Sequence, residues 1–249
     1  MCGISGVIPL NNEITTAQMM EWISILLKGN MSRGRDSTGI ATFDRGVTPV
    51  RVDMFKGIGD ADAFLKVFKE EYIVGPTICH NRAATCGPYT NNNNNHPLYG
   101  EKYCIIHNGV VHMPKIENYP YRGECDTELI LSYIETYGFE EGVKKIDGSA
   151  CIALFNVEEE TFHLYKHTNP LYLLYIPGLM IAFSSTENPL KEIVRKTPIH
   201  KIYGLFPSAH LIEADEGMYL KLNVMDPNSY SLTNIKIEPS YMKNKVFCY

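Results

Sequence analysis

The first half of the chain alternates short apolar runs with patterns of helical spacing. Residues 1–9 are largely apolar, as in a buried strand, and residues 17–28 repeat apolar side chains every three or four positions between threonines and a glycine. That second pattern predicts an amphipathic helix. Further along, the same reasoning predicts strands at 40–43, 50–55, 77–80 and 103–107, and helices at 60–69 and 126–137.

The second half consists mainly of strands. The pattern predicts four successive strands at 150–157, 161–166, 171–176 and 179–184, then a helix at 189–195 and two more strands. Many strands with helices in blocks, without strict βαβ alternation, favour an α+β fold with two sheets packed face to face and helices outside. The run of five asparagines at 91–95 is the one low-complexity element, and we expect it to be an exposed loop.

Composition narrows the class of protein. Of 249 residues, 45% are hydrophobic and 20% charged, as is usual for a soluble globular protein. The net charge of −5 and the scattered lysines and arginines argue against nucleic-acid binding. Because the most apolar stretch, 171–183, is short and broken by a Pro-Gly pair, and no signal segment opens the chain, we expect no membrane association and a cytoplasmic location.

The cysteines do not form a disulfide pattern. Seven are present at irregular spacing, and Cys79, Cys104 and Cys151 lie in apolar runs, as small buried residues do. No paired C-x2-C and H-x3-H spacing occurs among the cysteines and histidines. We therefore expect reduced thiols, no metal and no other cofactor.

Cys2 differs from the other cysteines because of its position. Removal of Met1 would place a thiol and a free α-amine on one residue, and an α-amine with a pKa of about 8 is able to take the thiol proton. Two glycines, Gly3 and Gly6, leave the approach to the thiol uncrowded. Taken alone, a cysteine at position 2 is also compatible with an irrelevant N-terminal thiol.

Six motifs that follow one another along the chain favour a functional role for Cys2 over an irrelevant thiol. They are MCGISGV at 1–7, RGRDSTG at 33–39, HNRAAT at 80–85, HP at 96–97, HNGVV at 107–111 and DTE at 126–128. In order and spacing they resemble the class II glutamine amidotransferase domain, most closely the glutaminase half of glucosamine-6-phosphate synthase. The resemblance covers about residues 1–215 and implies the four-layer αββα sandwich of N-terminal-nucleophile hydrolases.

The resemblance implies roles for the residues near the nucleophile. Cys2 would attack the side-chain amide of L-glutamine and release ammonia, and Arg33 would lie beside it. Asn108 and Gly109 would form the oxyanion hole, in which a side-chain amide and a backbone N–H receive the developing negative charge. The alternative for Asn108-Gly109 is a type I′ turn between strands.

The resemblance also implies an amino-acid clamp. Arg82 would bind the α-carboxylate of glutamine and Asp126 its α-ammonium, while His80, Thr85 and His96 would support the substrate. The alternatives are a surface salt bridge for Arg82, a helix N-cap for Asp126 and buried polar groups for His80 and Thr85. The chain departs from the family at two positions, where Ala83 and Cys86 replace a tryptophan and a histidine of the region that covers the substrate.

These features predict a domain at 2–215, followed by a strand and a docking arm at 216–249. Because the 34 residues after 215 are too few for a synthase, we expect a separate ammonia-accepting enzyme as partner. Two other functions stay open: a self-contained amidohydrolase acting on another amide, and a catalytically silent glutamine-binding regulatory domain. The pairing of Arg82 with Asp126 favours glutamine over other amides, and Cys2 with Asn108 argues against a silent domain.

Overall fold

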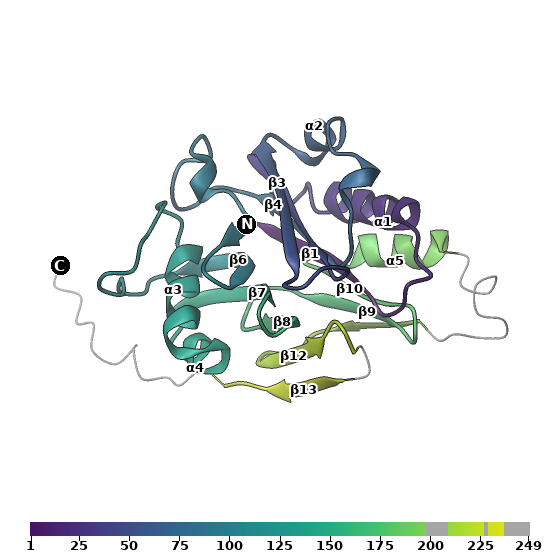
Figure 1. The fold of residues 1–249 in the computed structure, drawn as a ribbon. Helices are drawn as coiled ribbons and strands as arrows, with labels where there is room; N and C mark the ends of the chain where they lie inside the picture. The colour runs from purple at the N-terminus through teal and green to yellow at the C-terminus, as the bar shows by residue number, and fades with distance from the viewer. Residues whose placement is uncertain (198–208, 227–228, 237–249) are drawn as a thin grey trace.

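Two antiparallel sheets lie face to face between two layers of helices (Figure 1). The computed structural model describes residues 1–197, 209–226 and 229–236. The first sheet has seven strands in the order β11-β9-β10-β1-β4-β2-β3, with bounds His210–Glu213, Tyr172–Ile176, Met180–Ser184, Gly3–Pro9, Thr77–Arg82, Ser37–Asp44 and Arg51–Ile58. The second has six in the order β13-β12-β8-β7-β6-β5, with bounds Tyr230–Asn234, Met218–Asn223, Thr161–Lys166, Gly148–Asn156, Tyr103–Val111 and Leu98–Tyr99.

Helices cover the outer face of each sheet. The first sheet packs against α1 (Thr16–Gly29), α2 (Ala61–Leu65) and α5 (Glu187–Lys196), and the second against α3 (Thr127–Tyr137) and α4 (Phe139–Lys144). Helix α1 begins where the sequence predicts because Thr15 and Gln18 form a reciprocal capping box. Two short 3-10 turns, Glu70–Tyr72 and Asn92–Asn94, complete the helical segments that the structure describes.

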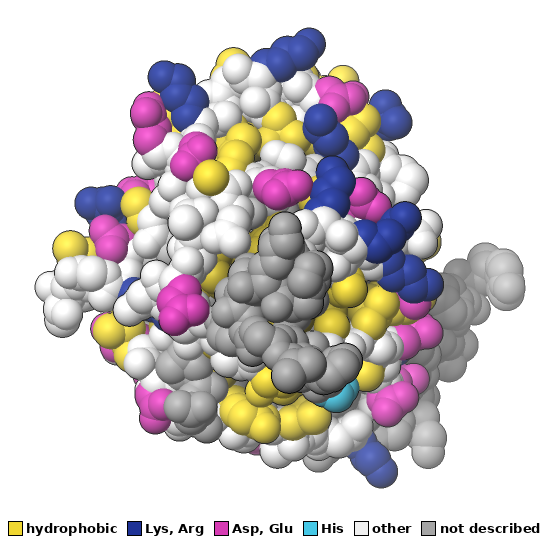
Figure 2. All heavy atoms as spheres, turned by 90° about the vertical axis from the view of Figure 1, so that its right-hand side faces the viewer, with side chains coloured by type: hydrophobic (Ala, Val, Ile, Leu, Met, Phe, Trp, Pro, Cys, Tyr) yellow, Lys and Arg dark blue, Asp and Glu magenta, His cyan; other side chains and the backbone are white. Residues whose placement is uncertain are grey.

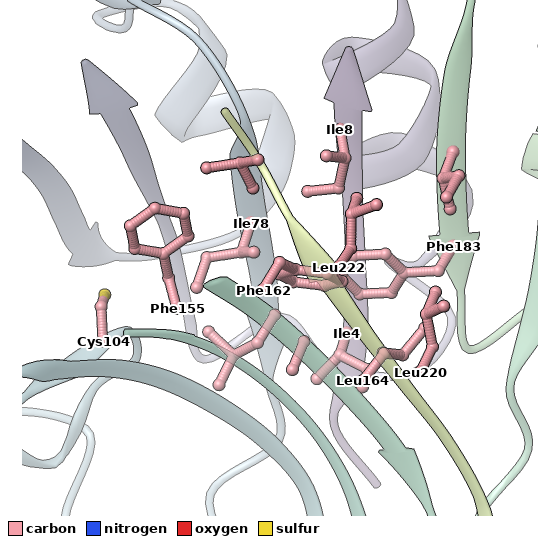
Figure 3. Packing of buried hydrophobic residues seen from close by; sticks show 14 of the residues in the cluster. Ile4, Ile8, Ile78, Cys104, Phe155, Phe162, Leu164, Phe183, Leu220 and Leu222 are labelled. Carbon is pink, nitrogen blue, oxygen red and sulfur yellow. The ribbon is translucent and has the colours of Figure 1, made fainter. Parts of the chain in front are cut away.

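The main core lies between the sheets. Along β1, alternate residues point to opposite faces, so that Ile4 and Ile8 enter the inter-sheet core and Val7 packs against the helices. Figure 3 shows this core, where Ile4, Ile8, Ile78 and Phe183 of the first sheet meet Phe155, Phe162, Leu164, Leu220 and Leu222 of the second. The stacked rings of Phe43 and Phe155, with centroids 4.0 Å apart, join the two sheets directly.

The architecture confirms the predicted αββα sandwich, and the burial of Cys79, Cys104 and Cys151 is also confirmed. Two helices differ from prediction. The helix expected over 60–69 ends at Leu65, and α4 was not predicted although Phe139 and Val143 have helical spacing. Gly142 allows α4 to lie close to α3, because a Cβ there would be 2.9 Å from the Cα of Ile134.

The C-terminal part extends the second sheet. Where one extra strand was expected, β12 and β13 are present, and β12 pairs with both β8 and β13. The remaining residues of the predicted docking arm, 237–249, lie outside the described residues.

On the face shown in Figure 2, lysine and arginine side chains are interspersed with acidic ones, so that neither positive nor negative charge dominates this face. No helix in the described part of the chain combines the length and apolar character needed to cross a membrane.

Candidate functional site

Cys2 is the residue directly before β1, a central strand flanked by β10 and β4. Its side chain is 9% exposed, and its Sγ donates to the backbone oxygen of Ala83 at 3.4 Å. Burial raises the pKa of the thiol, and the positive charges of the N-terminus and Arg82 act in the opposite direction. Met1, by contrast, is 70% exposed, so its removal would disturb little packing.

Arg33 and Asn108 converge on the main chain of Cys2. Arg33 Nε donates to the Cys2 carbonyl at 2.9 Å. Asn108, with its amide oriented so that both atoms have partners, donates from Nδ2 to the same carbonyl at 2.9 Å and accepts from Arg33 Nη2 at 3.3 Å. Since Asn108 is on β6 of the second sheet, these bonds fix the main chain of Cys2 against both sheets.

Asn108 and Gly109 are not in a turn. Both lie inside β6, paired with Cys151 and Ala150 of β7, so the type I′ turn considered from the sequence is wrong. Asn108 is fully buried, and its carbonyl accepts from Asn169 Nδ2 at 2.8 Å. A side chain at Gly109 would collide with Ser149 O and the ring of His107, which explains the glycine.

Arg82, at the end of β4, is 2% exposed and not a surface salt-bridge residue. Nη1 donates to Asn95 Oδ1 at 3.0 Å, and Nη2 donates to the carbonyls of Cys86 and Gly87 at 2.6 and 2.9 Å. No carboxylate pairs with it among the described residues. The guanidinium is therefore held in place by neutral acceptors and keeps its charge available for an anion.

Asp126 occupies the N-cap position of α3, as the alternative expected, but its side chain makes no capping bond, so capping does not account for its carboxylate. Oδ2 accepts from the backbone N–H of Val111 at 2.9 Å, and Oδ1 lies 3.7 Å from Cys125 Sγ. No lysine or arginine in the described segments pairs with it. Burial is the largest influence on the pKa of the Cys2 thiol, while the positive charge of Arg82 lowers this pKa and the negative charge of Asp126 raises it.

The segment after Arg33 holds the end of β4. Asp36 donates its N–H to Arg82 O at 2.9 Å, and its Oδ2 accepts from the N–H of Ala84 at 2.8 Å. Gly34 lies against the backbone of Arg82 with no room for a Cβ. The loop that carries Arg33 toward Cys2 therefore also fixes the peptide groups around Arg82.

The structure places His80 and His96 in the interior behind these groups. Their ring centroids are 4.0 Å apart, and His96 Nε2 bonds to Thr127 Oγ1, which also contacts His107 Nδ1. Burial lowers the pKa of all three histidines, that of His80 to about 3, so they are neutral. The described residues contain no group of three or more His, Cys, Asp or Glu placed to hold a metal ion.

Thr85 and Cys86 lie on the loop after β4. Thr85 is exposed and Cys86 partly buried. Burial raises the pKa of the Cys86 thiol, which disfavours the reactive thiolate.

The prediction of an exposed loop at 91–95 is confirmed for residues 91–93, which are exposed, and is wrong for the last two asparagines. Asn94 and Asn95 are fully buried, and their amides bond to backbone groups on neighbouring loops. Sequence reasoning missed both residues because a polar repeat has no hydrophobic periodicity. Their position directly before the His96-Pro97 motif was the available signal.

Comparisons with known proteins agree with this geometry. Residues 80–192 match the family model described as a glutamine amidotransferase domain. The chain is 30% identical over 221 residues to glutamine–fructose-6-phosphate aminotransferase (isomerizing) of Oceanobacillus iheyensis, covering 77% of this chain and 33% of the relative. The Methanococcus maripaludis protein of the same name is 33% identical over 204 residues, covering 70% of this chain and 31% of the relative. The chain thus spans about a third of the length of these relatives.

Solved structures share the fold. Glutamine phosphoribosylpyrophosphate amidotransferase of Bacillus subtilis gives a TM-score of 0.69 at 15% identity, over 95% of this chain and 50% of that one. A glutamine aminotransferase class-II domain protein of Silicibacter pomeroyi gives a TM-score of 0.54 at 12% identity, over 95% of this chain and 100% of that one. The family match and the sequence relatives together identify the chain as carrying a glutamine amidotransferase domain, and its sandwich fold is shared with the solved amidotransferase structure.

Proposed function

We propose that this domain hydrolyses the side-chain amide of L-glutamine to glutamate and ammonia, with Cys2 as nucleophile after removal of Met1. The observation that carries the proposal is the meeting of Cys2, Arg33 and Asn108, three residues from separate segments, within hydrogen-bond distance of one another. The nucleophile and the oxyanion donor come from opposite sheets, an arrangement that needs the complete sandwich.

The chemistry follows from the groups present. The α-amine of Cys2 takes the thiol proton, and the thiolate attacks the amide carbon of glutamine. Asn108 Nδ2 has two hydrogens, so one serves the Cys2 carbonyl and the other is available, together with the N–H of Gly109, for the oxyanion. Collapse of the tetrahedral intermediate expels ammonia, which carries away the proton held by the amine, and leaves a thioester. Water then hydrolyses the thioester to glutamate and restores the thiol.

Substrate selection rests on Arg82 and Asp126. A buried guanidinium and a buried carboxylate, neither in an ion pair within the described residues, suit the α-carboxylate and α-ammonium of a free amino acid. A hydrolase for simple acyl amides has no need of both charges. This pairing supports glutamine over another amide, with Thr85 on the loop beside the clamp and His80 and His96 supporting it from behind.

The ammonia acceptor is a further part of the proposal. This chain covers about a third of the length of its relatives, whose name describes transfer of the amino group to fructose 6-phosphate. We propose that the domain delivers ammonia to a separate synthase, docked through the part of 216–249 that follows the buried strand β12. Ala83 and Cys86, which replace the bulkier residues of the family, leave that partner to complete the cover over the substrate.

The decisive experiment joins mass analysis of the N-terminus with an assay of ammonia release from L-glutamine. The proposal predicts a mature chain that begins at Cys2 and is modified at that residue alone by a glutamine-like electrophile. An intact Met1 in a protein that still hydrolyses glutamine would contradict the mechanism. Hydrolysis of unrelated amides in preference to glutamine would support a self-contained amidohydrolase, and glutamine binding without turnover would support a regulatory domain.

A further inference from the structure

Asn94 connects the two loops that carry the charges of the clamp. Its Nδ2 donates to the carbonyl of Pro88 at 3.0 Å, and its Oδ1 accepts from the N–H of Glu124 at 2.7 Å. Pro88 follows Gly87, whose carbonyl binds Arg82, and Glu124 stands two residues before Asp126. One buried amide therefore bridges the Arg82 side and the Asp126 side of the site.

Two glycines make this bridge possible. A Cβ at Gly87 would lie 2.6 Å from Asn94 Nδ2, and a Cβ at Gly123 would lie 2.5 Å from Asn94 Oδ1. The amide is thus enclosed between the backbones of the two loops, at a distance that side chains would prevent. Such a contact sets a fixed spacing between the loops.

Neighbouring residues fix each end of the bridge. On the Arg82 side, Asn95 Oδ1 accepts from Arg82 and from Ser37 Oγ, and Lys56 Nζ donates to the Asn95 carbonyl at 2.8 Å. On the Asp126 side, the carboxylate of Glu128 accepts from the N–H groups of Arg122 and Gly123 at 2.8 and 2.9 Å. Because both ends are held, Asn94 couples two already ordered loops and does not merely fill space.

We propose that Asn94 is a positioning residue that sets the separation of Arg82 and Asp126 and so gives the site its preference for a free α-amino acid. This inference rests on the proposed function, in which those two residues bind the α-carboxylate and α-ammonium. A substrate that uses both charges depends on their spacing. A substrate that uses only one of them does not.

The test compares three amides by ammonia release from the full chain. These are L-glutamine, 4-carbamoylbutanoate, which lacks the α-ammonium, and 4-aminobutanamide, which lacks the α-carboxylate. In Asn94→Ala we expect KM for L-glutamine to rise about tenfold with little change in kcat, because two hydrogen bonds that hold the spacing are lost. The values of kcat/KM for the two single-charge amides should change less than about twofold. Titration of L-glutamine into a Cys2→Ala background should show the same weakening.

Three further variants separate the possible causes. Asn94→Asp keeps the acceptor for Glu124 and should show a smaller loss of selectivity. Gly123→Ala disturbs the same contact from the loop side, and it serves as the test if Asn94→Ala does not fold. Asn156→Ala is the matched control, since Asn156 is also buried and accepts two backbone N–H bonds but lies at the β7–β8 turn. The control should leave the preference for glutamine unchanged.

The outcomes distinguish failure of the proposed role of Asn94 from failure of the proposed glutamine clamp. An unchanged KM for L-glutamine in Asp126→Asn would contradict the clamp itself. If Asp126→Asn raises KM but Asn94→Ala lowers activity on all three amides in the same proportion, Asn94 has only a structural role and the inference is overturned.

Discussion

Replacement of Asn108 by aspartate tests the oxyanion hole with little change in shape. The new carboxylate still accepts from Arg33 Nη2, which lies 3.3 Å from the amide oxygen. The substitution removes both hydrogens of Nδ2, one bound to the Cys2 carbonyl and one available for the oxyanion. It also places a negative charge beside the position where the oxyanion forms. Loss of one such donor typically costs about 2.7–4 kcal/mol, or about 10²–10³ in kcat.

The effect should fall on kcat more than on KM. A neutral amide oxygen in the ground state accepts a weaker hydrogen bond than the oxyanion does, so the lost interaction belongs mainly to the transition state. Asn108→Asp should therefore lower kcat by about 10²-fold or more and change KM by less than about threefold. Steady-state ammonia release gives both constants, and single-turnover trapping of the thioester isolates the first step.

The control is Asn108→Ala, which also removes the acceptor of Arg33 and should lose about 1–3 kcal/mol of stability. Thermal unfolding of the two variants distinguishes loss of chemistry from loss of fold. A kcat for Asn108→Asp within about threefold of the parent, in a folded protein, would refute the assignment of Asn108 to the oxyanion hole.

Three other predictions follow from the structure. Cys2→Ala and Cys2→Ser should both lose glutamine hydrolysis with an unchanged circular dichroism spectrum, because a hydroxyl is a poorer nucleophile at the same pH; retained turnover in Cys2→Ala would exclude the mechanism. Burial lowers the pKa of His163 to about 3. As the pH falls below about 6.5, the unfolded chain therefore binds a proton at this residue that the folded chain does not bind. The free energy of unfolding should decrease by about 1.4 kcal/mol per pH unit between about pH 6.5 and 3 because of this residue. Denaturant unfolding of His163→Gln should show a pH slope shallower by that amount, and an identical slope would contradict the burial effect. Phe155→Ala, which removes a stacked ring from the inter-sheet core, should cost about 3–5 kcal/mol in urea unfolding, and a loss below about 1 kcal/mol would mean that the core closes around the gap.

Local signals in the sequence were sufficient for the general architecture. Hydrophobic periodicity located α1 and the strands of the second half, because burial on one face of a helix or strand imposes a period of 3.6 or 2. The boundaries were less well predicted. Helix α4 was missed because Gly138 ends α3 at once, and nothing local indicates that a second helix then packs against it.

The identity of the candidate nucleophile was also available from the sequence, since Cys2 and the six motifs are contiguous segments. The alternatives for the other site residues were not decidable at that level. Asn108-Gly109 has the composition of a hairpin turn, and only its pairing with β7 keeps it in a strand. Asp126 stands at an N-cap position, and only the N–H of Val111, on a strand of the neighbouring sheet, directs its carboxylate away from the helix.

Sequence patterns alone therefore predict most of the secondary-structure elements, the two-sheet architecture and the candidate site residues. Tertiary structure alone decided how those residues meet. Asn108 reaches Cys2 across two sheets, and Asn94, near the end of an asparagine run with the composition of a solvated loop, becomes a buried bridge between the loop after Arg82 and the loop before Asp126. The physical reason is that a side-chain amide favours water unless hydrogen bonds inside the protein offset the cost of its desolvation. Its location depends on whether distant backbone groups offer it hydrogen bonds, and those groups come together only when the chain is folded.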